Sequence, residues 1–285
     1  MKIYVIGIGL IGGSMALELK QLFDDCTIIG VDQSDTHLEE ALSLGIIDEK
    51  GGLDTLAEAD RVILSIPVKE CLRLLPSILD QLNKDALLFD VGSTKEQFCK
   101  VVENHPKRDQ YLAAHPIAGT EFSGPKAAHI GLFKGKPQIL CEAKKTRADL
   151  LTWSKTTFRQ MGMYLRFMGP QEHDRHMACV SHLSHISSFM LGKTVLEQET
   201  NEQNIFDLAG SGFESTVRLA KSSPDMWAPI FEQNKENVLE ILSAYIKNLE
   251  AFKSKLAADA IDDLHQQIKH TNQLTTILNG IKHNN

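Results

Sequence analysis

The histidine His115 is the residue of this sequence that is best suited to proton transfer. It opens the stretch His-Pro-Ile-Ala-Gly-Thr-Glu (115–121), directly after a short apolar run. A lone histidine is more often structural, but this one falls at the predicted carboxyl end of a strand and precedes a rigid proline and a permissive glycine. An imidazole, with a reference pKa near ~6.5, can take a proton from a substrate hydroxyl at neutral pH. The stretch therefore indicates a general base.

A second polar segment, Asp90-Val91-Gly92-Ser93-Thr94-Lys95, also follows an apolar run. Parallel α/β sheets bind their ligands at the carboxyl ends of strands. We therefore expect this segment to lie beside His115.

A third segment holds four histidines, His173, His176, His182 and His185, within 13 residues. On an ideal helix, with about 100° between residues, the first two would face one side and the last two another. We therefore predict no metal site on this helix.

Ser181, His185 and Ser188 would share one face of that helix. This face predicts a polar wall toward a small-molecule pocket, and buried structural histidines are the alternative. Arg218 lies further along the chain. On the surface its ion pair would contribute little, whereas in a cleft it would bind a substrate carboxylate through hydrogen bonds of ~1.5–3 kcal/mol each.

A glycine-rich segment, Gly7-Ile8-Gly9-Leu10-Ile11-Gly12, follows the apolar run Ile3–Ile6 and opens a helical stretch. The first glycine permits a tight turn, the second lets a pyrophosphate approach the backbone, and the third lets helix and strand pack closely. The helix N-terminus then holds the phosphate charge. This context predicts a dinucleotide site that includes Leu10 and Ile11, whereas glycines alone would indicate only a turn.

Asp32 ends the second predicted strand and selects the cofactor. A carboxylate there accepts a hydrogen bond from a ribose hydroxyl and repels a 2′-phosphate. The residues that follow are Gln33, Ser34 and Asp35, with no arginine among them. NAD is therefore favoured over NADP, and an exposed turn aspartate is the alternative. Ser65, at the end of another predicted strand, is included in the cofactor site.

The elements that would position these residues form two domains. Strands and helices alternate in residues 1–169, which predicts an α/β domain with a doubly wound parallel sheet. Residues 170–285 show only helical patterns, including one long helix from Pro224 to about Leu256 that Ser223 would cap. The apolar surface of this helical half predicts a homodimer. The expected strands are Ile3–Ile6, Thr27–Val31, Arg61–Ser65, Ala86–Asp90, Tyr111–Ala114, Gln138–Cys141 and Tyr164–Phe167, and the expected helices include Ser14–Phe23, Thr36–Leu44 and His173–Leu191.

Composition narrows the class of protein. Of the 285 residues, 42% are hydrophobic and 24% charged, which is typical of a globular protein. The net charge of -7 and the absence of a long basic run argue against nucleic-acid binding. Five dispersed cysteines indicate reduced thiols and a cytoplasmic location. No apolar run approaches the ~18 residues of a membrane span, and the N-terminal run predicts a strand rather than a targeting segment.

Together these segments resemble the prephenate/arogenate dehydrogenase family. The resemblance runs from about residue 3 to 235, in the family's order, and the most specific pieces are His-Pro-Ile-Ala-Gly-Thr-Glu (115–121) and Ser-His-Leu-Ser-His (181–185). It implies an N-terminal Rossmann domain, an all-α C-terminal dimerisation domain and an active site between them. It also implies NAD-dependent oxidative decarboxylation of prephenate to 4-hydroxyphenylpyruvate in tyrosine biosynthesis. Arogenate, which would give tyrosine directly, is the alternative substrate.

The resemblance also implies roles for single residues. His115 would take the proton of the ring hydroxyl, and Ser93 would orient that histidine. Arg218 would bind a substrate carboxylate, and Glu121 would lie at the pocket entrance. Tyrosine inhibition is expected to be competitive. The remaining pocket residues that it implies are Ser181, His182 and His185.

Several positions depart from the family pattern, and one bears on specificity. Ser215 stands where some members have an acidic residue, which leaves the response to an amino or keto side chain open. A 3-hydroxyacid dehydrogenase would need a catalytic lysine after residue 169, and Lys193 lies too far along. A non-catalytic NAD-sensing protein would have no use for His115, Ser93 and Arg218 together. The other departures are Ile117 and Ser184.

Overall fold

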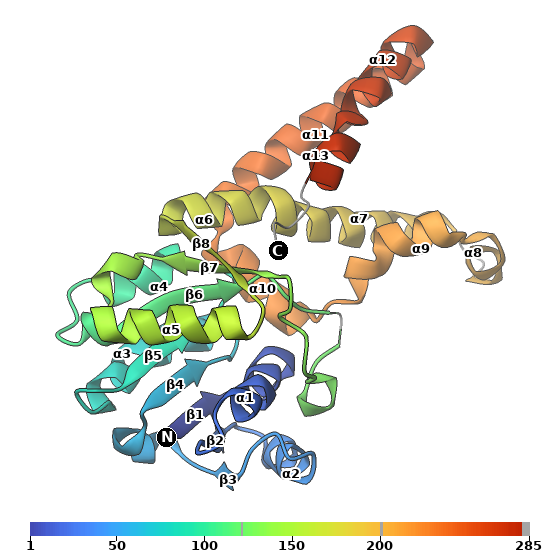
Figure 1. Cartoon of the computed structure of the whole chain (residues 1–285). Helices are drawn as coiled ribbons and strands as arrows, with labels where there is room; N and C mark the ends of the chain where they lie inside the picture. Colours follow the sequence, from blue (N-terminus) through green and yellow to red (C-terminus); the bar gives the residue numbers. More distant parts are fainter. Residues whose placement is uncertain (121, 200–201, 281–285) are drawn as a thin grey trace.

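An eight-stranded sheet forms the first part of the chain in the computed structural model, which describes residues 1–120, 122–199 and 202–280 (Figure 1). The strand order is β3-β2-β1-β4-β5-β6-β7-β8. Each of the predicted strands is present, and the short strand β3 is an addition. The strands are β1 (Lys2–Ile6), β2 (Thr27–Val31), β3 (Glu49–Lys50), β4 (Arg61–Leu64), β5 (Leu87–Asp90), β6 (Tyr111–Pro116), β7 (Pro137–Cys141) and β8 (Tyr164–Met168).

The sheet is parallel from β3 to β6, but β7 runs antiparallel to β6. The prediction of a wholly parallel sheet is therefore wrong at this strand. The physical reason lies in the connection, because a parallel neighbour requires a long crossover, usually a helix. Between β6 and β7 the described residues contain only a short 3₁₀ turn, Pro125–Ala127. The next strand, β8, is again parallel to β7 and follows helix α5 (Ala148–Gln160).

Helices cover both faces of the sheet, which confirms the doubly wound fold. The strand side chains alternate, so that Ile3 and Val5 enter one apolar cluster and Tyr4 and Ile6 the other. The first cluster includes residues of α5 and the second includes residues of α10 (Pro224–Gln233). The other helices that contribute are α1 (Leu10–Leu22) and α2 (Asp35–Ser43) on the first face, and α3 (Val68–Gln81) and α4 (Glu96–Val101) on the second.

After β8 the described chain is helical, as predicted. Trp227 and Ile230 of α10 pack into the same apolar cluster as residues of α3. The helical part is therefore docked on one face of the sheet domain through a shared core. Its elements are α6 (Pro170–Met177), a π-helical turn (Ala178–His182), α7 (Leu183–Gln198), α8 (Glu202–Leu208), α9 (Ser211–Val217), a 3₁₀ turn (Arg218–Lys221), α10 (Pro224–Gln233), α11 (Lys235–Ala257), α12 (Ile261–Thr271) and α13 (Gln273–Gly280).

Two predicted helices are divided in the structure. The long helix from Pro224 breaks at Asn234, whose buried side chain bonds to groups outside its own helix, including the carbonyl oxygen of Asp174. The backbone of Asn234 leaves the helical conformation there, with φ of -105° and ψ of 27°. Ser223 precedes α10 as predicted, but its side chain makes no capping hydrogen bond. The helix expected at 173–191 is interrupted by the π-helical turn.

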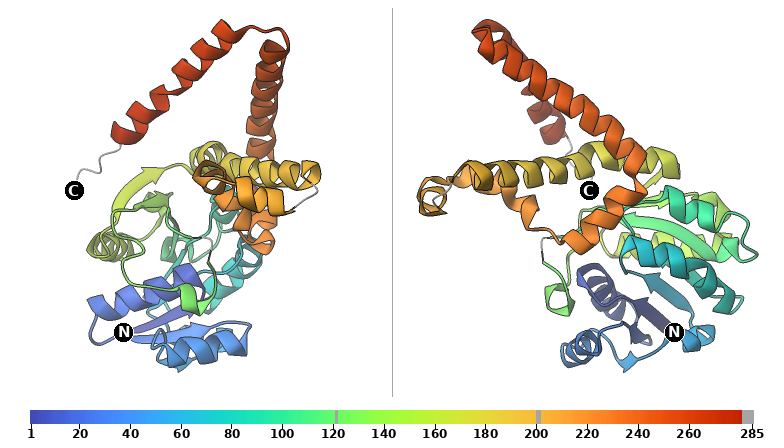
Figure 2. Two further views of the ribbon diagram at one scale, coloured as in Figure 1. Left: turned by 90° about the vertical axis from the view of Figure 1, so that its right-hand side faces the viewer. Right: turned by 180° about the vertical axis from the view of Figure 1, so that it is seen from behind.

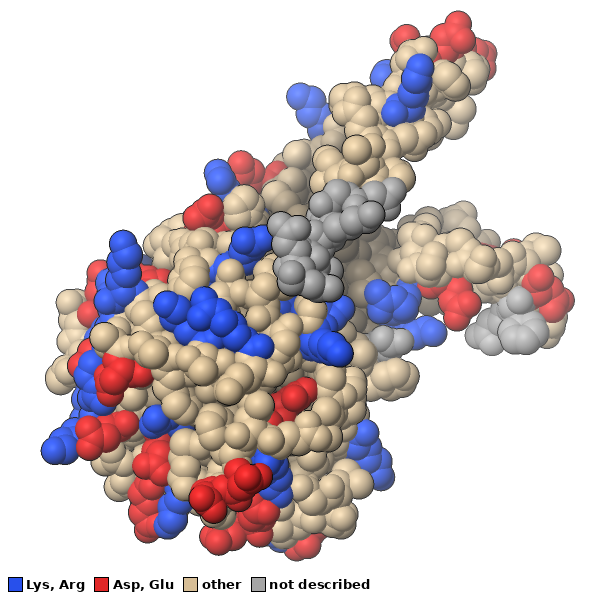
Figure 3. Space-filling model, in the orientation of Figure 1, with Lys and Arg blue, Asp and Glu red and all other residues tan. Residues whose placement is uncertain are grey.

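Two helical arms extend from the sheet domain (Figures 1 and 2). One contains α7 to α9, and the other is the V formed by α11 with α12 and α13. The arms expose many large apolar side chains, whereas both signs of charge occur side by side over the face of the sheet domain in Figure 3. No helix among the described residues is long and apolar enough to cross a membrane. The exposed apolar residues of the V are Leu239, Ile246, Leu249, Phe252, Leu256, Ile261, Ile268, Leu274, Ile277 and Leu278.

Candidate active site

The glycine-rich turn joins β1 to α1 at the point where the strand order reverses, between β1 and β4. Gly7 has a φ of 93°, and a Cβ there would lie 2.3 Å from the carbonyl oxygen of Ser65. A Cβ on Gly12 would lie 2.2 Å from the carbonyl oxygen of Gly7. Both glycines therefore allow α1 to pack against the two strands. A Cβ on Gly9 would have no neighbour within 4 Å, so the space above this residue is open to a ligand.

Asp32 lies directly after β2, and its side chain contacts the backbone of this turn. Its Oδ2 accepts a hydrogen bond from the backbone N–H of Ile8 at 3.0 Å, and its Oδ1 accepts one from Ser34 at 2.9 Å. Leu10 begins α1 and Ile11 follows it. The structure thus brings the predicted cofactor residues together, with Ser65 following β4 beside them. An open helix N-terminus next to a carboxylate fits a dinucleotide.

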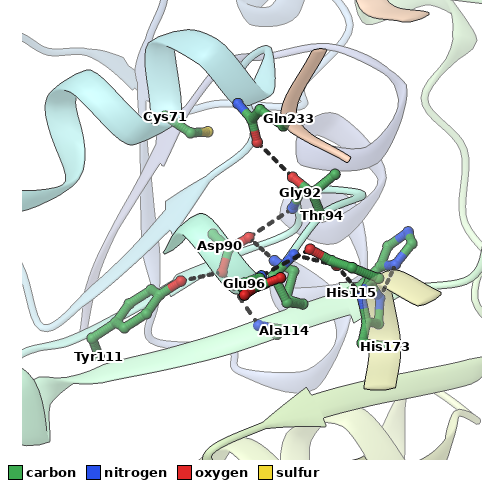
Figure 4. A network of polar contacts seen from close by, with 12 residues as sticks. Cys71, Asp90, Gly92, Thr94, Glu96, Tyr111, Ala114, His115, His173 and Gln233 are labelled. Atoms are coloured by element: carbon green, nitrogen blue, oxygen red, sulfur yellow. Dashed lines mark hydrogen bonds and ion pairs between the residues drawn. The ribbon is translucent and has the colours of Figure 1, made fainter. Parts of the chain in front are cut away.

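His115 is the penultimate residue of β6, and its ring is held by a second histidine (Figure 4). The His115 Nδ1 atom lies 2.8 Å from Nε2 of His173, and the His173 Nδ1 atom lies 2.7 Å from Oδ1 of Asp174. Asp174 Oδ1 accepts the backbone N–H of Lys95 at 2.7 Å, and Oδ2 accepts that of Glu96 at 3.0 Å. A continuous polar chain therefore links His115 to the N-terminus of α4.

Burial sets the charge of these rings. It lowers the pKa of His115 well below its usual value, and the neighbouring groups His173, Lys95 and His182 lower it further by opposing a second positive charge. Burial also lowers the pKa of His173, although Asp174 opposes the shift. Removing an imidazolium from water costs more than removing the neutral ring. Both histidines are therefore neutral at neutral pH.

A buried ion pair shapes the loop after β5. The Lys95 ammonium pairs with Asp90 Oδ2, and both side chains are fully buried. Asp90 Oδ1 accepts the hydroxyl of Tyr111 at 2.7 Å, and Oδ2 accepts the backbone N–H of Gly92 at 2.8 Å. At the other end of the loop, the hydroxyl of Thr94 donates to Oε1 of Gln233 in α10 at 2.6 Å. The loop that carries Ser93 is thus anchored to both the sheet and the helical domain.

The segment 181–185 forms the opposite wall. His182 is buried, its Nδ1 lies 3.1 Å from Nδ2 of Asn234, and burial lowers its pKa to about 4. His185 stacks on Trp227 with a ring-centroid distance of 3.6 Å, and its Nδ1 faces the carbonyl of Ser181 at 3.0 Å. Burial lowers the pKa of His185, and the nearby charge of Arg218 lowers it further. His185 is therefore close enough to Arg218 to feel its charge.

Two predicted placements differ from those in the structure. His173 and His182 do not face opposite sides, because both are buried and the amide of Asn234 contacts His182 and the carbonyl of Asp174. The π-helical turn between them shifts the angular phase that an ideal helix would give. Ser188 does not line a pocket wall with Ser181 and His185; its hydroxyl donates to the Thr216 carbonyl at 2.9 Å.

Ser93 and Glu121 gain no direct support from the geometry. Among the described residues, His115 Nδ1 bonds to His173 and not to Ser93. Glu121 lies outside the described residues. The described part of the chain also contains no group of three or more His, Cys, Asp or Glu side chains that could hold a metal ion. The orienting contact on His115 thus comes from His173, a residue that the sequence analysis did not assign to the active site.

His173 and Asp174 are the functional candidates that sequence reasoning missed. Strand β7 is antiparallel to β6 and β8 is parallel to β7, so β8 ends at the edge of the sheet where β6 begins. Helix α6 begins there, separated from β8 by Gly169 alone, so no local signal places the pair beside His115 near the other end of β6. Their contacts across the sequence, however, follow only from the docking of α6 against α4.

Comparison with known proteins agrees with this geometry. The family model for the nucleotide-binding domain of prephenate dehydrogenase matches residues 15–165, and the model for the dimerization domain of prephenate dehydrogenase matches residues 169–270. This chain belongs to the prephenate dehydrogenase family. Prephenate dehydrogenase of Bacillus subtilis is 31% identical over 275 residues, covering 94% of this chain and 73% of the relative. Cyclohexadienyl dehydrogenase of Zymomonas mobilis is 29% identical, covering 94% of this chain and 93% of that protein.

Solved structures of the prephenate dehydrogenase family share the whole fold. The prephenate dehydrogenase of Aquifex aeolicus, solved with hydroxyphenyl propionate and NAD+, has a TM-score of 0.85 and 32% identity, with 98% of each chain covered. The arogenate dehydrogenase of Synechocystis has a TM-score of 0.78 and 26% identity, covering 98% of this chain and 100% of the other. Both the sheet domain and the helical domain therefore have counterparts in these enzymes.

Proposed function

We propose that this chain catalyses the NAD-dependent oxidative decarboxylation of prephenate to 4-hydroxyphenylpyruvate. The observation that supports this most strongly is the position of His115 at the carboxyl end of β6, where its Nδ1 atom lies 2.8 Å from Nε2 of His173. Parallel strands β1, β4, β5 and β6 end at the same edge of the sheet, so the glycine-rich turn, Ser65 and His115 share that edge. A base beside a dinucleotide turn is the arrangement that hydride removal from a carbinol carbon requires.

The residues of the turn would hold the cofactor. The N–H groups at the start of α1 would face the pyrophosphate, the open space at Gly9 would admit it, and Asp32 would accept a hydrogen bond from a ribose hydroxyl. Bound NAD supplies the hydride acceptor. A carboxylate at this position disfavours the 2′-phosphate of NADP by like-charge repulsion.

His115 takes the proton of the substrate's ring hydroxyl as the carbinol carbon loses its hydride. The bond from the ring to the carboxylate then breaks, its electron pair enters the ring, and carbon dioxide leaves. The hydroxyl oxygen stays on the ring, which becomes an aromatic phenolate and takes a proton back from His115 to give the phenol of the product, so the step is effectively irreversible. Ser93 lies in the loop anchored by Asp90 and would donate to the same hydroxyl.

The substrate carboxylates would face Arg218 and the His185 wall. An arginine fork binds a carboxylate through two parallel hydrogen bonds, and the Trp227–His185 stack shields the ring from water. Ser181, His182 and Glu121 complete the proposed pocket. Tyrosine has the carboxylate and the phenol ring of the product, so we also propose that it competes with prephenate for Arg218.

Replacing Arg218 tests this pocket. In Arg218→Gln we expect KM for prephenate to rise about tenfold or more, since each charge-assisted bond contributes ~1.5–3 kcal/mol. The inhibition constant for tyrosine should rise with it, whereas KM for NAD should not change. Lys221→Gln, a nearby loss of the same charge, serves as the control. An unchanged KM for prephenate in the Arg218 variant would contradict the assignment.

The reaction itself is tested by measuring NADH or NADPH formation with prephenate and arogenate, each with NAD and NADP. We expect prephenate with NAD to give the highest kcat/KM. A preference for arogenate would leave the proposed reaction type unchanged. It would change the proposed substrate, whose side chain would then be recognised near Ser215. No turnover of either substrate by a protein that binds NAD would overturn the proposal.

We further propose that the chain works as a homodimer. Residues 169–270 match the dimerization domain of the family. The V of α11 to α13 exposes a stripe of apolar residues, among them Leu249 at 52% and Phe252 at 40% exposure. A monomer rarely leaves apolar surface of this extent in contact with water. A second copy of this chain would cover it.

A further inference from the structure

The polar chain behind His115 crosses from one domain to the other. His115 belongs to the sheet domain, whereas His173 and Asp174 lie on α6 of the helical domain. We propose that His173 and Asp174 are positioning residues that fix the tautomer of His115, so that the base is formed only where the helical domain is docked on the sheet. This inference rests on the proposed function of His115.

The protons along the chain can be assigned from the Asp174 end. Asp174 Oδ1 accepts the N–H of Lys95 and Oδ2 accepts that of Glu96, so both carboxylate oxygens face donors. The nitrogen of His173 that faces Oδ1 must therefore donate as well, and it is Nδ1. A neutral imidazole has one N–H, and the other nitrogen is an acceptor. The Nε2 atom of His173 is therefore an acceptor.

The same rule applies to His115. Because Nε2 of His173 accepts, Nδ1 of His115 must carry the proton and donate across the 2.8 Å contact. The lone pair of His115 is then on Nε2, the nitrogen that points away from His173. Free imidazole side chains exchange between both tautomers, and the partner of one nitrogen decides which form is populated. The chain thus holds the base in the form that can accept a substrate proton.

The position of Asp174 depends on the docking of the two domains. Its carboxylate satisfies the first N–H groups of α4, a helix of the sheet domain, while its own carbonyl oxygen accepts Nδ2 of Asn234 at 2.7 Å. Asp174 and His173 are both buried, at 2% and 0% exposure. A shift of α6 relative to α4 would break the two backbone contacts and the tautomer control together.

A purely structural role for His173 would have different consequences. If the ring only fills space, a leucine would cost stability without changing the proton positions on His115. If it controls the tautomer, its loss changes which nitrogen of His115 bears hydrogen. Glutamine offers an oxygen that could accept the His115 N–H, so it should restore part of the control.

The experiment compares His173→Leu, His173→Gln and the wild type, with His176→Leu as the control. His176 lies on the same helix but is half exposed, with its Nε2 3.7 Å from Glu172. For each protein the tautomer of His115 is read from the ¹⁵N shifts of its ring nitrogens above pH ~6.5, and kcat and KM are measured with prephenate and NAD. His115→Asn identifies the ring signals and tests the base itself.

We expect wild-type His115 to carry its proton on Nδ1. In His173→Leu a second tautomer should appear and kcat should fall about a hundredfold, within the ~10²–10⁴-fold that a general base contributes. KM for prephenate should stay within a few fold, and His173→Gln should recover part of kcat. The control should match the wild type.

Two results would overturn the inference. One is a wild-type His115 with its proton on Nε2, which is decided without any variant and so does not depend on whether His173→Leu folds. The other is a folded His173→Leu with wild-type kcat. If instead His115→Asn keeps full activity, the proposed function of His115 fails, which is a separate outcome.

Discussion

At the residue scale, the low pKa of His115 has a direct kinetic consequence. The neighbouring groups His173, Lys95 and His182 add to the effect of burial in disfavouring the protonated form of the ring. A base with a lowered pKa keeps its lone pair to lower pH and loses it only as the pH falls through that pKa. We therefore expect kcat/KM for prephenate to be level above pH ~6.5 and to fall on acidification, with a midpoint below the reference value.

Steady-state rates with saturating NAD, measured across pH at constant ionic strength, check this expectation. NAD affinity measured over the same pH range serves as the control, because it separates loss of the base from loss of the cofactor. A midpoint at or above the reference value for histidine would show that burial does not set the charge of this ring.

Single residues differ in how well the sequence predicted them. Asp32 and the glycines were predictable, because their roles depend on local geometry and close spacing. His115 was predictable from its place after a strand. His173 was not, because its partner lies 58 residues away and nothing in its neighbouring sequence shows which element covers it.

At the scale of the elements, the turn between β1 and α1 allows a matched pair of variants. Gly12→Ala should destabilise the protein, because the new Cβ would lie 2.2 Å from a backbone oxygen. Gly9→Ala should fold with an unchanged melting temperature, since a Cβ there meets nothing, but should raise KM for NAD about tenfold or more by blocking the approach of the pyrophosphate.

Thermal unfolding and KM for NAD, measured on both variants, separate the two roles. KM for prephenate is the internal control for Gly9→Ala and should change little. If Gly9→Ala binds NAD as well as the wild type does, the open space at Gly9 is not the pyrophosphate site.

The elements that the sequence misplaced share a physical cause. An apolar run predicts a buried strand but not its direction. The one indication that β7 is antiparallel was that no helix was predicted between β6 and β7. Apolar periodicity continues through Asn234 and through the π-helical turn, although both change the course of the helix. In each case the apolar pattern does not record the deciding feature, which is the short connection before β7, the π-helical turn itself, or the contacts of Asn234 with Asp174 and His182.

At the scale of the whole molecule, the exposed apolar stripe of α11 predicts association. Phe252→Glu should convert a dimer into monomers, because burying a carboxylate in an apolar interface carries a high desolvation cost. Light scattering of the purified protein measures this directly. Lys253→Glu, on the adjacent exposed position, is the matched control. A Phe252→Glu protein that keeps the mass of a dimer would contradict an interface on this stripe.

The two domains also share the chemistry. The proposed proton acceptor and the cofactor turn belong to the sheet domain, whereas the substrate wall and the residues behind His115 come from the helical domain. The family resemblance implied an active site between two domains, but not that a buried chain of hydrogen bonds would cross the boundary through His173 and Asp174. Docked surfaces of this kind depend on packing between distant segments, which no local pattern encodes.

The most direct test of the whole account is the rate of NADH formation from prephenate by His115→Asn beside the wild type, with NAD binding measured on both. Asparagine can hold a hydrogen bond near the ring hydroxyl but cannot take its proton. The account predicts that kcat falls by about 10²–10⁴-fold while NAD binds with unchanged affinity. A variant that binds NAD and turns over prephenate at the wild-type rate would contradict it.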